Sequence, residues 1–491
     1  MNADTRTRHV VVVGGGIAGL AAAHRLVSAG LRVTLLEGGD RLGGKLLAGE
    51  IAGAPVDLGA ESLLARRPEA IALARAVGLG DRLRPPATTT ASVWTRGTLR
   101  PMPKGHVMGV PGDAAALTEL LSDEGLRQVA RDRELPPAEI GEDIAIGAYV
   151  AERMGHEVVD RLVEPLLGGV YAGDAYRISM RAAVPALFAA ARTHPTLTDA
   201  VHAVQRAGAA TPSDAAGAAT GLGGSAFLGI DGGIGTLPEA VATAIRAAGG
   251  EILTLMPVTE LRRAVDGQWR VAAGGREFLA DAVVVAAPAW AAAELLAAEA
   301  PVAARELGTV EYASMALVTL AFRRQDVHAL PGSGFLVPPV DGRTIKASTF
   351  SSQKWQWVAD GAPDLFVLRT SVGRYGEEEQ VFRDDADLVE ASLKDLAAAA
   401  GLTAKPVATT VTRWTGGLPQ YPVGHLARVA RIHDAVAEVP GLRVAGAVYE
   451  GVGIPACVAS GHRAADEIAA GFADEIIATS ETTHPGAGHC P

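Results

Sequence analysis

The chain has 491 residues, of which 48% are hydrophobic, a length and composition typical of a globular protein with two or three domains. It carries 55 acidic and 44 basic residues, and the net charge of −11 argues against a general attraction to nucleic acids. Cys457 and Cys490 are the only cysteines, so the sequence offers neither a disulfide framework nor a zinc cluster and favours a reducing cytoplasm.

Two stretches bear on membrane targeting. The first nine residues contain no apolar run, so we expect no secretion signal before the first strand. Leu279–Ala304 is the longest tract that looks apolar, but charged residues and prolines interrupt it. We interpret it as a strand, Ala282–Ala287, followed by a turn and a helix. A transmembrane span is therefore not expected, and peripheral contact with a membrane stays open.

Val10–Gly44 has the pattern of a dinucleotide-binding unit. An apolar strand leads into Gly14, Gly16 and Gly19, a helical segment follows, and a second strand ends at Glu37. In this pattern the first glycine allows the tight turn, the second lets the backbone approach a pyrophosphate, and the third allows close packing of helix and strand. The phosphates would lie at the helix N-terminus, and Glu37 would accept hydrogen bonds from the adenosine ribose.

The loop after Glu37 favours FAD over NAD. Arg41, Gly43, Gly44 and Lys45 form the sequence R-x-G-G-K. This loop resembles the second glycine signature of the flavin amine oxidase superfamily, in which it lies along the cofactor.

The rest of the chain alternates between α/β and helical patterns. We expect an α/β fold with a discontinuous Rossmann-like FAD-binding domain, a mixed-sheet substrate domain and a helical insert. Further along the chain we expect hairpins at Gly49–Leu58 and Ala91–Leu99, a helix from Pro68 to about Gly78, an irregular loop at Pro101–Pro111, helices with breaks at Pro136–Pro137 and Gly168–Gly169 within Ala114–Ala191, an antiparallel pair at Val258–Arg263 and Trp269–Ala273, strands between Tyr312 and Ser371, a helix at Asp385–Ala400, a strand at Leu442–Ala447 and a helix at Ile454–Ala470. The predicted FAD-binding domain comprises residues 1–90, 225–300 and 405–475, the substrate sheet 301–404 with 91–104, the helical insert 105–224 with a flexible loop at 207–224, and a disordered tail 476–491.

Three further runs carry a resemblance to one family. They are PMPKG at Pro101–Gly105, EPLLGGVYAGDAYRIS at Glu164–Ser179 and GAVYEGVGIPACVASG at Gly446–Gly461. With the R-x-G-G-K loop they resemble the protoporphyrinogen oxidase family, and most of all its coproporphyrinogen III oxidase branch of Gram-positive bacteria. The resemblance covers the chain from about Val10 to Ala470.

The resemblance implies a reaction and a cofactor site. FAD would accept hydride equivalents from a porphyrinogen, dioxygen would reoxidise it to give hydrogen peroxide, and three rounds would remove six electrons. It implies that Val258 contacts adenine through its backbone and that Trp414 lies near the isoalloxazine. It also implies a closing loop, Val452, Gly453 and Ile454, where a helix N-terminus stabilises negative charge on the flavin. The predicted FAD-binding residues are Gly14, Gly15, Gly16, Ile17, Ala18, Gly19, Glu37, Gly38, Arg41, Gly43, Gly44, Lys45, Gly59, Ala60, Glu61, Ser62, Val258, Trp414, Gly446, Val452, Gly453 and Ile454.

Substrate residues are harder to predict. Coproporphyrinogen carries four propionates and protoporphyrinogen two, so the former needs more cationic or amide donors. Arg66, Arg67, Lys104 and Arg177 are candidate carboxylate partners, and each could instead be a solvated surface charge. We find no Ser-His-Asp set, no metal site and no identifiable catalytic base.

Three alternatives stay open. The substrate could be protoporphyrinogen IX. The chain could be another flavin oxidase or desaturase of the superfamily, acting on amines or carotenoid precursors. It could also be a non-catalytic binding protein on the same fold, like the inhibitors that sequester prenylated GTPases. Contact with a downstream enzyme of the haem pathway also stays open.

Overall fold

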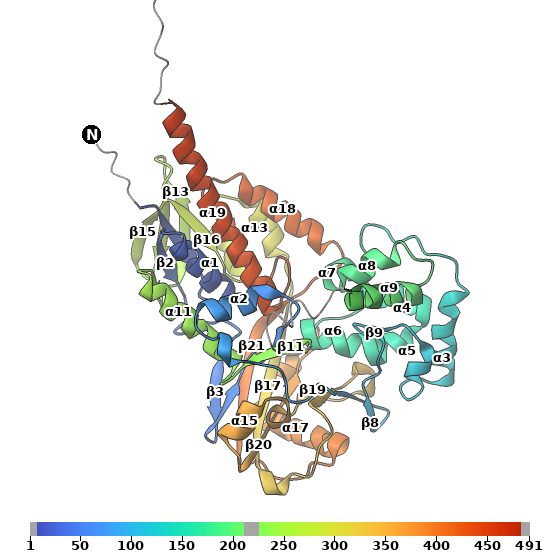
Figure 1. The fold of residues 1–491 in the computed structure, drawn as a ribbon. Coiled ribbons are helices and arrows are strands. Elements are labelled where there is room, and N and C mark those ends of the chain that lie inside the picture. The colour runs from blue at the N-terminus through green and yellow to red at the C-terminus, as the bar shows by residue number, and fades with distance from the viewer. Residues whose placement is uncertain (1–6, 211–224, 483–491) are drawn as a thin grey trace, which may run out of the picture.

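The computed structural model describes residues 7–210 and 225–482. Figure 1 shows two sheet-containing parts stacked end to end, with a group of helices beside them. The first part contains both the N-terminal strand and the long C-terminal helix, so the first and last described elements belong to the same part (Figure 1). Among the described residues, no helix is both long and apolar enough to cross a membrane.

The first part is built on a five-stranded parallel sheet in the order β12-β2-β1-β16-β22. Its strands are β1 (His9–Val13), β2 (Arg32–Leu36), β12 (Glu251–Leu253), β16 (Ala282–Val285) and β22 (Leu442–Val444). Alternate valines of β1 belong to two cores on opposite faces, Val10 and Val12 to one and Val11 and Val13 to the other. Burial on both faces explains the unbroken apolar run, and it confirms the predicted strand, helix and strand at the N-terminus.

Helices cover one face of this sheet, and helices with a small antiparallel sheet cover the other. The first layer contains α1 (Ile17–Ser28), α2 (Pro68–Ala76), α11 (Leu237–Ala247) and α19 (Ile454–Thr482). The second contains α12 (Ala289–Leu296), α13 (Pro301–Gly308), α18 (His425–Ala437), β13 (Val258–Arg263), β14 (Trp269–Ala273) and β15 (Arg276–Ala280). The predicted antiparallel pair is confirmed.

The C-terminal helix differs from its prediction. The sequence pattern predicts that it ends at Ala470, whereas α19 continues through Gly471 to Thr482. A glycine inside a helix costs only about 1 kcal/mol relative to alanine, so it does not by itself stop a helix. The predicted tail 476–491 is thus helical to Thr482, and residues 483–491 lie outside the described part of the chain.

The second part is a mixed seven-stranded sheet in the order β21-β17-β20-β19-β18-β7-β8. Its strands are β7 (Ser92–Thr95), β8 (Thr98–Pro101), β17 (Tyr312–Arg323), β18 (Gly334–Leu336), β19 (Ile345–Thr349), β20 (Leu365–Val372) and β21 (Ala408–Pro419). The β7–β18 pair is parallel and the others are antiparallel. The predicted hairpin turn is confirmed, because Arg96 and Gly97 both have positive φ, 53° and 74°, as a two-residue turn requires.

Two elements depart from the predicted division of the chain. β21 lies within residues 405–475, yet it pairs with β17 along the edge of the seven-stranded sheet. α13 lies within residues 301–404, yet it packs against the five-stranded sheet. Both boundaries depend on pairing between distant segments, which local composition does not encode.

Helices and hairpins complete the second part and join it to the first. The helices are α14 (Ser351–Lys354), α15 (Gln356–Gly361), α16 (Glu378–Val381) and α17 (Asp385–Ala400). β3 (Ala48–Ile51) and β4 (Ala54–Asp57) form the predicted hairpin. β11 (Phe227–Ile230) lies between β5 (Leu63–Leu64) and β6 (Leu83–Arg84). Short 3-10 helices span Gly80–Arg82, Ala114–Leu117, Arg131–Arg133, Ile234–Thr236, Arg324–Asp326 and Pro339–Asp341.

The helical insert has a core of its own, which Val93 and Tyr421 from outside the insert join. Its elements are β9 (His106–Val107), β10 (Val110–Pro111), α3 (Asp123–Ala130), α4 (Ile146–Met154), α5 (His156–Val158), a π-helix (Val159–Val163), α6 (Glu164–Tyr171), α7 (Met180–Ala183), α8 (Pro185–Ala191) and α9 (Leu197–Ala210).

Three predictions for the insert were wrong in part. Gly168 and Gly169 do not break the helix, which ends instead at Tyr171 and is followed by Ala172 in the left-handed conformation. The expected irregular loop at 101–111 contains the antiparallel pair β9–β10. The expected flexible loop starts too early, because residues 207–210 belong to α9, and residues 211–224 lie outside the described part.

Candidate cofactor site

The glycine turn after β1 separates packing from open space. A Cβ on Gly14 would lie 2.5 Å from the Ala286 carbonyl oxygen, and Gly14 has φ of 105°. A Cβ on Gly19 would lie 2.0 Å from the Gly14 carbonyl oxygen. Gly16 differs, because no atom lies within 4 Å of its Cβ position and its φ of −68° suits any residue. The protein's own packing requires glycine at 14 and 19, whereas Gly16 keeps space free in front of α1.

Glu37 binds the backbone of the glycine turn through its carboxylate. Its carboxylate accepts hydrogen bonds from the Gly15 N–H at 2.6 Å and the Gly39 N–H at 2.7 Å. A carboxylate has about four acceptor positions, so capacity remains for ribose hydroxyls. The Glu37 N–H donates to Leu253 at 2.9 Å, and a Cβ on Gly38 would lie 3.5 Å from Pro257. The structure therefore brings Glu37 and Gly38 beside the segment that leads into Val258.

The R-x-G-G-K loop folds onto the glycine turn. The Gly43 N–H donates to the Gly15 carbonyl at 2.8 Å, and a Cβ on Gly44 would lie 3.3 Å from the Gly16 Cα. The Arg41 guanidinium donates to the Gly44 carbonyl at 2.7 Å and lies 5.5 Å from the centre of the Trp414 ring. Two motifs that were found separately in the sequence thus form one continuous surface with Trp414.

Lys45 and the loop at Gly59 extend this surface. The Lys45 side chain is exposed, yet desolvation by the surrounding protein, with Arg41 nearby, lowers its pKa. The Ala60 N–H donates to the Lys45 carbonyl at 3.0 Å. A Cβ on Gly59 would lie 2.1 Å from that carbonyl oxygen and 3.1 Å from Cζ2 of Trp414. Glycine at 59 is therefore required by close approach of two loops and an indole.

The Glu61 side chain points into the protein, although it was predicted among the FAD-lining residues. Its carboxylate lies 2.6 Å from the Lys354 Nζ and 3.1 Å from an Arg369 Nη. Burial alone would raise the pKa of Glu61, but Arg369 and Lys354 outweigh it and hold that pKa below its ordinary value. Its contribution to a cofactor site is therefore through the loop that it anchors.

The closing loop comes from the other end of the chain. A Cβ on Gly461 of α19 would lie 2.2 Å from the Ala18 carbonyl of α1, so the two helices pack in close contact. The Gly446 N–H donates to the Ser460 hydroxyl at 3.0 Å, and no atom lies within 4 Å of the Gly446 Cβ position. Cys457, in the first turn of α19, is buried, and burial raises the pKa of its thiol to about 12, so this thiol is unreactive. Val452, Gly453 and Ile454 lead into the N-terminus of α19 here.

The four predicted substrate residues do not form one cluster. Arg66 and Lys104 are exposed, at the start of α2 and between β8 and β9. Arg67 already pairs with Glu69 at 2.6 Å. Arg177 pairs with Glu311 at 2.7 Å and donates a hydrogen bond to the Tyr375 hydroxyl. A substrate carboxylate would have to displace Glu69 or Glu311 to bind either of the paired arginines.

The structure also places charged side chains that are not among the predicted site residues in poorly solvated positions. Burial raises the pKa of Glu164 to about 7, although the Ala175 N–H donates to its carboxylate at 2.6 Å. Glu164 borders a cavity of ≈ 290 Å³ that Asp160, Asp174 and Arg374 also line. Burial, with Arg374 nearby, lowers the pKa of Lys346 to about 7. Glu164 is the first residue of the EPLLGGVYAGD run, which is a signal that could have marked it. Nothing in the sequence marks Lys346 as buried.

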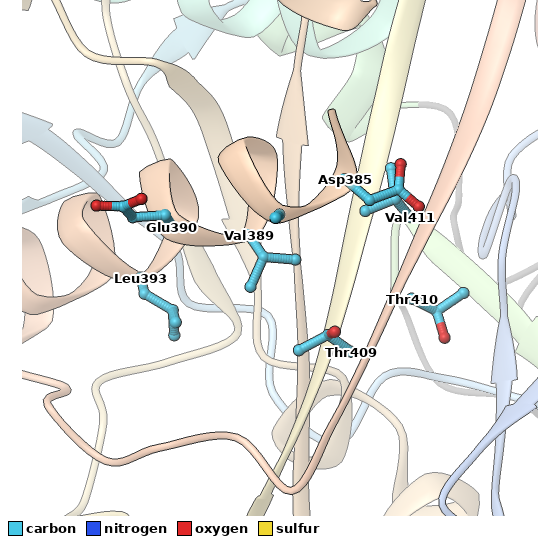
Figure 2. Close-up of a pocket in the computed structure, with 8 residues that line it drawn as sticks. Asp385, Val389, Glu390, Leu393, Thr409, Thr410 and Val411 are labelled. Atoms are coloured by element: carbon cyan, nitrogen blue, oxygen red, sulfur yellow. The ribbon is translucent and has the colours of Figure 1, made fainter. Parts of the chain in front are cut away.

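A separate groove of ≈ 720 Å³ lies between α17 and the edge strand β21. Figure 2 shows Asp385, Val389 and Leu393 of α17 facing Thr409 and Val411 of β21. None of its lining residues belongs to the predicted cofactor or substrate set.

Comparison with known proteins identifies the family. The model of the flavin-containing amine oxidoreductases matches residues 17–469, and the chain belongs to this family. A coproporphyrinogen III oxidase of Mycobacterium tuberculosis strain H37Rv is 35% identical, over 94% of this chain and 97% of that protein. The coproporphyrinogen III oxidase of Bacillus subtilis strain 168 is 33% identical over the same shares. A crystal structure from Exiguobacterium sp. 255-15, assigned as a protoporphyrinogen oxidase, is 34% identical with a TM-score of 0.82 and covers 96% of this chain and 99% of its own.

The residues present fit the flavin cofactor of this family, which is FAD. The open space at Gly16 lies at the N-terminus of α1, which no described side chain caps, and such a terminus binds phosphate. The Glu37 carboxylate accepts a hydrogen bond from the Gly15 N–H of the same turn, and α19 packs against α1 through Gly461. The class of protein is thus a flavin oxidoreductase, as the sequence predicted.

Proposed function

We propose that this protein oxidises coproporphyrinogen III to coproporphyrin III in haem biosynthesis, with FAD as cofactor and dioxygen as acceptor. The observation that carries the proposal is the 35% identity to a coproporphyrinogen III oxidase over almost the full length of both chains. The match includes the insert, where the EPLLGGVYAGD run lies. Six electrons leave the substrate in three rounds, with one hydrogen peroxide formed in each.

Bound FAD supplies the chemistry by accepting hydride equivalents that dioxygen then takes up. The chain's own residues would hold and orient the cofactor. The N–H groups at the α1 N-terminus bind the phosphates, Glu37 accepts from the ribose hydroxyls, and the α19 N-terminus stabilises negative charge at the flavin end. Trp414 and the Gly59–Ser62 loop would line the flavin end of the site.

Substrate recognition calls for cations that meet propionates. We propose Arg66 and Lys104 as directly available partners, and Arg67 and Arg177 as partners that exchange Glu69 and Glu311 for a propionate. The second candidate function is oxidation of protoporphyrinogen IX, which the assignment of the Exiguobacterium structure favours. We further propose a cytoplasmic location and contact with a downstream haem-pathway enzyme.

One experiment separates these functions. The purified protein is examined for a flavin absorption spectrum, and porphyrin fluorescence and peroxide are followed with coproporphyrinogen III and protoporphyrinogen IX in parallel. We expect bound flavin, a higher kcat/KM with the four-propionate substrate, and three peroxides per porphyrin. A higher kcat/KM with protoporphyrinogen IX would establish the second candidate, and bound flavin with neither substrate oxidised would refute both.

A further inference from the structure

Three consecutive carbonyls of one loop are held by side chains of the seven-stranded sheet. Arg369 donates from Nη1 to the Asp57 carbonyl at 3.3 Å and the Gly59 carbonyl at 2.7 Å. Trp414 donates from its indole N–H to the Leu58 carbonyl between them at 3.1 Å. Arg369 is in β20 and Trp414 in β21, so two strands of the sheet anchor the same stretch.

The strand register places both side chains on one face of the sheet. Arg369 of β20 pairs with Thr319 of the neighbouring strand β17, and Thr319 pairs on its other side with Thr410 of β21. Directly paired residues share a face, and so do residues two and four apart along a strand. Trp414, four residues after Thr410, therefore faces the same side as Arg369. The Asp57–Gly59 loop lies across this face.

Glu61 fixes the Arg369 side chain. Glu61 is 7% exposed, and its carboxylate joins an Arg369 Nη at 3.1 Å with the Lys354 Nζ at 2.6 Å. Arg369 thus uses its planar guanidinium for two carbonyls and one carboxylate at once, a geometry that the single ammonium of a lysine cannot reproduce.

The same loop meets the cofactor surface on its other side. Gly59 approaches Lys45 so closely that a Cβ would lie 2.1 Å from its carbonyl oxygen. The R-x-G-G-K loop in turn covers Gly16. Arg369 is therefore one loop away from the surface that fits FAD, and it stands on the sheet proposed to carry the substrate.

We propose that Arg369, held by Glu61, is the positioning residue that sets the seven-stranded sheet, and with it the substrate, against the flavin. This rests on the proposed function for the identity of the substrate, but not for the binding of FAD. Hydride transfer depends steeply on the separation of donor and acceptor, and a misplacement of about 1 Å costs about a hundredfold in rate. A residue that fixes the loop between cofactor and sheet controls that separation without touching either reactant.

The test compares Arg369→Lys with a matched control, Arg374→Lys. Arg374 is also buried, donates to a backbone carbonyl, that of Val337, at 3.1 Å and pairs with a carboxylate, Glu377, but it has no contact with the Gly59 loop. Three quantities are measured: the melting temperature, the dissociation constant of FAD from the apoprotein, and the limiting rate of anaerobic flavin reduction by porphyrinogen.

For Arg369→Lys we expect the FAD dissociation constant to rise at least tenfold and the limiting reduction rate to fall at least tenfold, with the KM for porphyrinogen within twofold. Arg374→Lys should lower the melting temperature to a similar extent and leave FAD binding and the reduction rate within twofold. Equal losses in both variants, or no loss in Arg369→Lys, would overturn the proposal.

Two measures keep the test decisive. If Arg369→Lys does not fold, it is replaced by the double variant Glu61→Gln with Arg369→Gln. This variant has an amide pair in place of the ion pair, and it lacks the guanidinium that donates to the Asp57 and Gly59 carbonyls. The same tenfold changes are then expected, and values within twofold of wild type would refute the proposal. If neither porphyrinogen reduces the wild-type flavin, the proposed function is refuted. The FAD dissociation constants of the two variants still test whether Arg369 positions the loop at Gly59.

Discussion

Replacing Gly16 with valine should remove FAD and leave the fold intact. The backbone at 16 has φ −68° and ψ 172°, which valine adopts without strain, and a Cβ there meets no protein atom within 4 Å. We therefore expect the free energy of unfolding of the apoprotein to change by no more than about 0.5–1 kcal/mol. The isopropyl group would instead occupy the space in front of the α1 N-terminus.

The loss of affinity follows from the hydrogen bonds that the phosphates would lose. Each hydrogen bond to a charged group is worth about 1.5–3 kcal/mol, so losing two costs about 3–6 kcal/mol, or roughly a hundredfold to ten-thousandfold in the FAD dissociation constant. The assay is the flavin absorbance of the purified protein, followed by titration of the apoprotein with FAD. Gly16→Ala should show a smaller loss in the same direction.

A contrasting variant gives the control. A Cβ on Gly19 would lie 2.0 Å from the Gly14 carbonyl oxygen, so Gly19→Ala should lower the melting temperature of the apoprotein itself. Gly16→Val protein that purifies with normal flavin, or an apoprotein that melts as low as Gly19→Ala, would refute the assignment of this space to the cofactor.

Three other changes test buried groups. Burial raises the pKa of Asp57 to about 6, so the stability that its protonated form contributes is complete below about pH 3.8 and is lost as the pH rises through 6. In denaturant titrations, the free energy of unfolding of Asp57→Asn should therefore rise by roughly 3 kcal/mol relative to that of wild type between pH 4 and pH 7. A difference that stays constant with pH would contradict this. Burial lowers the pKa of His425 to about 4, so wild type should lose roughly 3 kcal/mol as the pH falls from about 6.5 to 4, a loss that His425→Gln should not show over the same titration. Trp269 is fully buried, and Trp269→Ala should cost about 3–5 kcal/mol in the free energy of unfolding, whereas a loss below 1 kcal/mol would mean that the site collapses around the gap.

Elements that depend on local pattern could be predicted from the sequence. The β1–α1–β2 unit, the β3–β4 and β7–β8 hairpins and the β13–β14 pair follow from apolar runs, alternation and turn glycines. The two glycine motifs were found separately, and their meeting at Gly16 and Gly43 agrees with the expected shared site.

What could not be predicted depends on contacts between distant segments. The partners of Glu61 are Lys354 in α14 and Arg369 in β20, and no sequence periodicity links residue 61 with either element. β21 pairs with β17, a strand that lies far earlier in the chain. Glycines at 168, 169 and 471 signalled helix ends that tertiary packing overrode. Arg177 was predicted from its charge alone, and its pairing with Glu311 is visible only in the folded chain.

The packing of α19 on α1 has a consequence for how the protein folds during synthesis. The ribosome makes the glycine turn long before the closing loop, and at about 5–20 residues per second the interval between them is tens of seconds. During that time α1 lacks the close contact that Gly461 of α19 makes with Ala18. The finished arrangement of the two helices therefore forms only after translation has passed Gly461.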